Sequence, residues 1–133
     1  MFESKAKWLR IAFIVGAITD GVAVLPMVYP PLARILWGLD GMPASFWFAM
    51  YYGAALMLGW TGLLVWAAIR AIERKFVAVL TALVIAGLMV AEVQAVNLGV
   101  IDARRLIPVA VLQAILLLLF LATYCGASAE HRA

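Results

Sequence analysis

The sequence has few of the side chains on which soluble proteins and most catalytic sites depend. Its 133 residues include one cysteine and one histidine, and only 13% of them are charged. A single cysteine excludes an intramolecular disulfide, and no Cys/His cluster with metal-ligand spacing can be assembled. The sequence also lacks a phosphate-binding loop, a nucleophile–base motif and a Lys/Arg tract suited to nucleic acid. It therefore predicts no metal, no cofactor and no nucleic-acid partner, and it gives no support for an enzyme.

Apolar residues are abundant instead. They make up 68% of the chain, and the mean hydropathy is +1.09, more than a soluble domain of this length could bury. Four apolar segments, at about residues 8–29, 45–69, 76–96 and 106–124, each have the length that a membrane-spanning helix needs. Backbone groups in lipid must be hydrogen-bonded internally, so we expect all four to be helices. No linker divides the chain. The prediction is an all-α integral membrane protein, a four-helix transmembrane bundle in one domain, residues 1–133, with the lipid bilayer as its first partner.

The first apolar segment also has the basic start of a signal peptide. However, Asp20 interrupts its apolar region, and no small-x-small cleavage site follows. We therefore expect this segment to remain as the first span.

The basic residues predict the orientation. Seven lie at the start of the first span, in the turn Arg70–Lys75 and at Arg132, against Arg34, Arg104 and Arg105 on the other side. By the positive-inside rule, both termini are cytoplasmic, and residues 30–44 and 97–105 form outer loops. We expect the inner membrane of a bacterium.

The first outer loop, Pro30–Pro43, has structure of its own. It begins with prolines, continues through Leu32, Ile35, Leu36 and Trp37, and ends near an Asp-Gly pair. This pattern predicts a short interfacial helix, which we interpret as a hydrophobic turn on the lipid surface in preference to a gating lid.

Small residues recur at four-residue spacing within the spans and would allow close helix packing. We interpret them as contacts within the bundle, although a homodimer face would use the same pattern. The sets are Ala12–Gly16, Ala17–Gly21, Ala55–Gly59 and Gly87–Ala91–Ala95.

Two carboxylates, Asp20 and Glu92, lie inside the spans. A lone charge in the bilayer centre costs about 2.5–3.5 kcal/mol on insertion scales, so such acids usually face the protein interior, pair with another group or serve a function. The simpler interpretation is a protonated or hydrogen-bonded acid that only orients the helices. At 1.5 Å per residue, Asp20 lies roughly 13 Å and Glu92 roughly 7–8 Å below the outer end of its span.

The other spans place polar groups at similar depth, whereas the inner half offers only threonines. We therefore predict a polar pocket in the outer half, above an apolar inner plug. Its candidate ligand-binding residues are Asp20, Tyr51, Tyr52, Glu92 and Gln113.

The pattern Asp20…Leu25-Pro26…Tyr29-Pro30, followed by Trp37, resembles the EXPERA-type membrane proteins, a group that includes sterol isomerases. The overall plan is also similar to DoxX-like four-helix proteins. The resemblance implies a four-helix bundle in which buried carboxylates, Asp20 among them, meet an amphipathic amine-like or sterol-like ligand. Those proteins carry a further acid in the second helix, where this chain has Tyr51 and Tyr52, so the resemblance favours ligand binding over isomerase activity.

Three functions are consistent with these features. The first is a non-enzymatic membrane protein whose outward-facing pocket binds a small amphipathic or cationic ligand. The second is a proton-coupled transporter of small hydrophobic cations, in which Asp20 trades a proton for substrate. The third is an accessory or assembly subunit of a larger membrane complex. An enzyme acting on a lipid-like substrate ranks below these, because no catalytic constellation is present.

Overall fold

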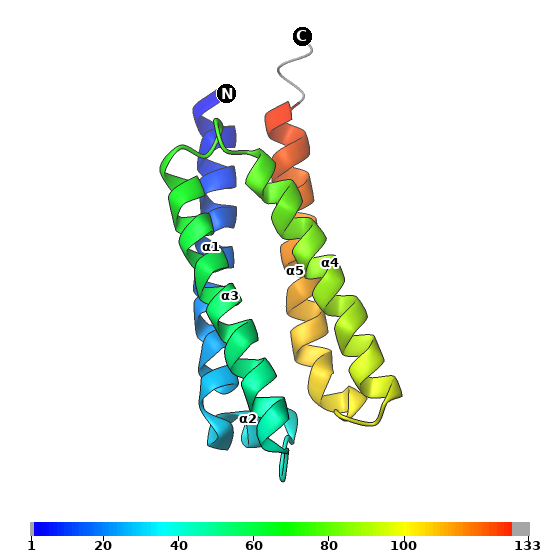
Figure 1. Ribbon diagram of the computed structural model, residues 1–133. Helices are drawn as coiled ribbons and strands as arrows, with labels where there is room; N and C mark the ends of the chain where they lie inside the picture. The colour runs from blue at the N-terminus through cyan, green and yellow to red at the C-terminus, as the bar shows by residue number, and fades with distance from the viewer. Residues whose placement is uncertain (1, 129–133) are drawn as a thin grey trace.

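The computed structural model describes residues 2–128, which form four long helices and one short helix. The start of α1, the end of α5 and the turn between α3 and α4 lie at one end of the bundle, and α2 lies at the other (Figure 1). This confirms the predicted all-α bundle with a short helix between the first and second spans. The helices are α1 (Phe2–Val28), α2 (Pro30–Trp37), α3 (Ala44–Ile69), α4 (Phe76–Asn97) and α5 (Ala103–Ser128).

The four long helices have 22 to 27 residues and are long and apolar enough to cross a membrane. At 1.5 Å per residue even the shortest is about 33 Å long, against a hydrocarbon core of about 30 Å. Two helices extend beyond the predicted spans, α1 at its start and α5 at both ends, because the helical backbone continues past the apolar run. The protein is a small four-span integral membrane protein.

The basic residues lie at the two ends of this bundle. Arg10 and the turn Arg70–Lys75 share one end, and Arg34, Arg104 and Arg105 share the other (Figure 1). Arg132, which the orientation argument also used, lies outside the described residues. The cytoplasmic placement of the first end stays a prediction from the positive-inside rule.

Helix α1 is the central element, because it packs along α3 on one side and against α5 on the other. Helix α5 also packs against α4. The core contact between α1 and α5 joins the rings of Phe13 and Phe120, whose centroids are 6.0 Å apart. A Cβ atom on Gly16 would lie only 2.8 Å from Cζ of Phe120, so the absence of a side chain there permits this close packing.

Helix α2 is defined by residues with strong backbone preferences. Tyr29 is extended, with φ −121° and ψ 94°, and separates α1 from the two prolines that open α2. Proline suits the first helical turn, where its missing N–H has no intrahelical partner in any case. Gly38 ends the helix with φ 72°, a left-handed conformation that favours glycine. Arg105 at the start of α5 fixes α2 in place by donating from Nη1 to the carbonyl oxygen of Ile35 over 3.0 Å.

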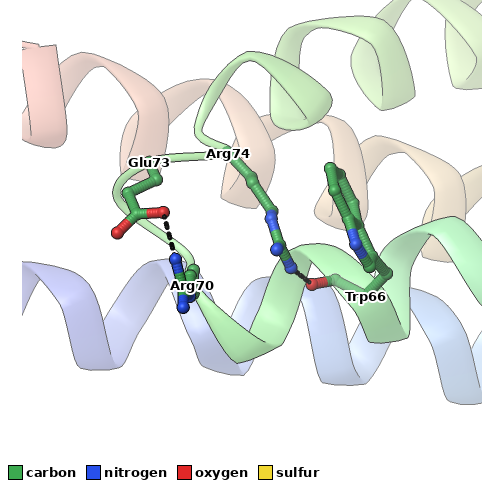
Figure 2. A network of polar contacts seen from close by, with 4 residues as sticks. All are labelled: Trp66, Arg70, Glu73 and Arg74. Atoms are coloured by element: carbon green, nitrogen blue, oxygen red, sulfur yellow. Dashed lines mark hydrogen bonds and ion pairs between the residues drawn. The ribbon is translucent and has the colours of Figure 1, made fainter.

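Two arginines bind the last turn of α3, where backbone carbonyls lack intrahelical partners. Arg10 donates from Nε to the carbonyl oxygen of Ala68 over 3.1 Å. Arg74 donates to the carbonyl oxygen of Trp66, and its guanidinium lies 3.6 Å from the centroid of the Trp66 ring (Figure 2). These contacts tie α1 and the turn before α4 to the same end of α3.

Candidate functional site

Asp20 lies on the buried face of α1. Ala17, three residues before it, and Val24, four residues after it, are both buried, and this spacing places all three on one face of the helix. Asp20 itself is half-buried. Among residues 2–128 its carboxylate has no hydrogen-bond or ion-pair partner.

A cavity of about 420 Å³ lies at this carboxylate. Helix α1 contributes Asp20, and the remaining wall comes mainly from α3 and α4, which diverge from their shared turn toward the end that carries α2 (Figure 1). Its rim includes large exposed apolar side chains, which places the opening on a surface that faces lipid. The lining residues are Asp20, Met27, Gly53, Leu56, Met57, Trp60, Thr81, Val84, Ile85 and Leu88.

The other polar groups of this wall are already hydrogen-bonded. Trp60 donates from Nε1 to Oγ1 of Thr81 over 3.3 Å, which links α3 to α4. Thr81 in turn donates to the carbonyl oxygen of Val77 over 2.8 Å. The carboxylate of Asp20 is therefore the polar group of this wall that still lacks a partner among the described residues.

Glu92 and Gln113 form a separate polar contact between α4 and α5. Nε2 of Gln113 donates to Oε1 of Glu92 over 2.6 Å. Gln113 is only 9% exposed, and its Oε1 atom is buried without a hydrogen-bond partner. Glu92 lines another hollow, of about 300 Å³, between the ends of α4 and α5. The structure thus brings Glu92 and Gln113 together and places the two acids in different hollows.

Helix register places Gln113 at the level of Asp20. The antiparallel helices α1 and α5 meet at Phe13 and Phe120. Asp20 lies seven residues after Phe13, and Gln113 lies seven residues before Phe120. Seven residues are about two turns, or roughly 10.5 Å, and return to nearly the same face of each helix. Gln113 is therefore bonded to one membrane acid and level with the other.

The two tyrosines are placed differently. Tyr51 and Tyr52 are 49% and 66% exposed on α3, and neither lines the cavity at Asp20 or the hollow at Glu92. The ring of Tyr52 contacts the ring of Phe48, with centroids 5.9 Å apart. Neighbouring Gly53, in contrast, lines the cavity.

Sequence reasoning missed the apolar residues that form the cavity. Met27 could have been found, because it follows Asp20 by seven residues and so lies on the same face of α1. Trp60 and Met57 carried no such signal, since α3 is apolar on all sides. Within the described part of the chain, no group of three His, Cys, Asp or Glu side chains could hold a metal ion.

No protein-family model matches the sequence, and neither curated proteins nor solved structures give a match. The resemblance to EXPERA-type and DoxX-like proteins therefore stays a prediction.

Proposed function

We propose that this four-span membrane protein binds a small amphipathic cation inside the membrane, in the cavity at Asp20. The observation that carries the proposal is the carboxylate of Asp20, which faces an apolar cavity and has no partner among residues 2–128. The cavity crosses the middle of the bundle, from Met27 near the α2 end to Trp60 and Thr81 in the other half. Access to it from the outside stays a prediction.

The chemistry of the cavity favours a cation with an apolar body. A carboxylate in a membrane interior is costly unless a cation or proton neutralises it, so a bound cation at Asp20 would stabilise the site. The indole of Trp60 lines the same cavity and would attract a cation through its ring face. The remaining walls are mostly aliphatic side chains and methionines, which suit an apolar substituent.

The volume limits the ligand. At about 420 Å³, the cavity is near the lower end of the range for small-molecule sites, which is about 300–1,000 Å³. Its apolar rim favours a ligand that partitions into lipid and reaches Asp20 from the bilayer. The predicted ligand contacts of four further residues are tested by substituting each of them in the binding assay described below. The four are Glu92, Gln113, Tyr51 and Tyr52.

Binding of octylammonium, with octanol as its uncharged counterpart, tests the proposal. The protein is reconstituted in lipid nanodiscs, and binding is measured calorimetrically against protein-free nanodiscs. We expect Asp20→Asn to weaken octylammonium binding roughly tenfold or more, because a hydrogen bond to a charged group contributes about 1.5–3 kcal/mol. Asp40→Asn is the matched control, since Asp40 lies in the exposed loop after α2, with Arg34 at 3.9 Å.

Equal octylammonium affinity in the Asp20→Asn variant and the wild type would overturn the proposal, as would equal binding of octanol and octylammonium by the wild type. The same cation distinguishes the transporter alternative. Its uptake into proteoliposomes, driven by a pH gradient and abolished by Asp20→Asn, would extend the function from binding to transport. A larger assembly that co-purifies in mild detergent would instead support the accessory-subunit alternative.

A further inference from the structure

We propose a second binding site, for an anionic glycerophospholipid, in a groove between α1 and α3 at the end of the bundle that carries the start of α1. The groove has a volume of about 580 Å³ and shares no lining residue with the cavity at Asp20. One acyl chain would lie along the groove, and the phosphate would bind Arg10.

The groove has the shape that an acyl chain requires. On each helix the lining residues are spaced by three or four positions, with one adjacent pair, and so lie along one face. The groove therefore runs parallel to the two helices over about eight residues, or roughly 12 Å. Ala17 and Ala68 are small and form its floor, and exposed branched side chains form its walls. The lining residues are Arg10, Ile14, Ala17 and Ile18 from α1, and Thr61, Val65, Ala68 and Ile69 from α3.

Arg10 supplies the one charged group in this lining. Its Nε donates to the carbonyl oxygen of Ala68, which holds the guanidinium across the gap between the two helices. Its terminal nitrogens, Nη1 and Nη2, have no partner among the described residues, and the side chain is exposed. Two such N–H groups match the oxygens of a phosphate, which arginine binds in bidentate fashion.

The rest of the lining offers no competing polar group. Thr61 uses its hydroxyl to donate to the carbonyl oxygen of Met57 over 2.9 Å. The groove is therefore charged at one end and apolar along its length, as a phospholipid is.

The Arg10 guanidinium lies at the membrane depth expected for a lipid headgroup. The side chain is bonded to Ala68, the second-last residue of α3, and the chain leaves the apolar span directly afterward at Arg70. The guanidinium thus lies where α3 reaches the membrane boundary, at the level of lipid phosphates.

The charge of this end favours an anionic lipid over a zwitterionic one. Six cations lie there among the described residues, against two acids, Glu3 and Glu73. Glu73 lies 3.4 Å from Arg70 and so neutralises a neighbouring cation. Clustered cations at the end of membrane spans attract anionic headgroups. The six are Lys5, Lys7, Arg10, Arg70, Arg74 and Lys75.

Native mass spectrometry of the full-length protein tests this site. The protein is exchanged into detergent with equal amounts of phosphatidylglycerol and phosphatidylcholine that carry the same acyl chains, and the ratio of bound lipids is measured. We expect the wild type to retain phosphatidylglycerol preferentially. Arg10→Gln should lower that preference roughly fivefold, the effect of one cation beside an anionic surface.

Arg104→Gln is the matched control, because Arg104 is an exposed arginine at the opposite end of the bundle. Val65→Trp provides a second variant that leaves Arg10 and its bond to Ala68 intact. It fills the groove from an exposed wall position and should reduce retention of the bound lipid while circular dichroism stays unchanged. Equal retention of the two lipids by the wild type would overturn the proposal. So would an unchanged lipid ratio in Arg10→Gln, or full lipid retention in Val65→Trp.

Discussion

Gln113 donates a hydrogen bond to Glu92 over 2.6 Å and so joins α5 to α4 inside the membrane. Hydrogen bonds between side chains of neighbouring helices stabilise helix association in the membrane. Gln113 follows the buried stripe of α5, in which Leu106, Gln113, Phe120 and Ala127 recur every seven residues. Gln113 thus occupies a buried position that is apolar elsewhere in this stripe, and its hydrogen bond to Glu92 offsets the cost of burying its amide.

We expect Gln113→Leu to destabilise the protein by about 1–2 kcal/mol. The reason is that it removes a hydrogen bond between helices, worth about 0.6–1.7 kcal/mol, and leaves the Glu92 side chain without its donor. The double variant Gln113→Leu/Glu92→Leu should recover most of the loss, because replacing both partners by apolar groups is often nearly neutral. Unfolding in mixed micelles measures both. A double variant less stable than Gln113→Leu would contradict the assigned pairing.

Gly16→Ala should destabilise the bundle, since the added Cβ would lie 2.8 Å from Cζ of Phe120. The Phe120 ring is 1% exposed and packs on Phe13, so a shift that made room for the new Cβ would disturb this core contact. We expect a loss of about 1–3 kcal/mol, the usual effect of overpacking a core, in the same micelle assay.

Gly59→Ala is the control for this variant, because a Cβ on Gly59 meets no atom within 4 Å. It should cost nothing and even gain from the better helix propensity of alanine. Equal losses for the two glycines would show that helix flexibility, and not the contact with Phe120, decides the effect.

The fold could be predicted because the bilayer permits few solutions. Four apolar runs of sufficient length must become helices, and the pair Pro30–Pro31 with Gly38 marks the start and end of α2. The ends of α1 and α5 were less predictable. Charged residues such as Lys5 continue a helix as well as apolar ones once outside the membrane, so hydropathy alone ends a span too early.

The candidate site could be predicted only in part. Asp20 and Glu92 stand out as acids in apolar runs, but each span is apolar on every side, so periodicity does not show which face points inward. The division of the two acids between different hollows depends on how α3 and α4 diverge (Figure 1), a property of packing that the sequence does not display. The hydrogen bond between Trp60 and Thr81 is unforeseen for the same reason.

Arg105→Gln should loosen α2 without unfolding the bundle. Arg105 donates from Nη1 to the carbonyl oxygen of Ile35, and its side chain also lies beside Gly38 at the end of α2. We expect faster amide hydrogen exchange across Pro30–Trp37, and unchanged exchange in α1 and α3.

Arg104→Gln serves as the control for this change, since Arg104 is the adjacent exposed arginine. Its backbone N–H donates to Asp102 over 2.8 Å, and its side chain has no hydrogen-bond partner among the described residues. Similar exchange in both variants would mean that general charge, and not the bond to Ile35, holds α2 in place.

Arg74→Gln should destabilise the turn between α3 and α4, whereas Arg70→Gln should not. Arg74 stacks on the Trp66 ring at 3.6 Å and binds the carbonyl oxygen of the same residue, while Arg70 pairs with Glu73 in the exposed part of the turn (Figure 2). A cation–π contact of this kind contributes about 0.5–1 kcal/mol, and the bond to the carbonyl adds about 1 kcal/mol. The exposed pair, with both side chains about two-thirds exposed, contributes roughly 0–0.5 kcal/mol.

Thermal unfolding followed by circular dichroism separates the two contributions at this turn. Arg74→Lys keeps the charge but lacks the planar guanidinium that stacks and donates at once, so its loss should fall between those of Arg74→Gln and Arg70→Gln. If Arg74→Lys is as stable as the wild type, charge alone stabilises the turn. If Arg70→Gln is the more damaging of the two glutamine variants, the exposed pair with Glu73 holds the turn, and the contacts of Arg74 with Trp66 are secondary.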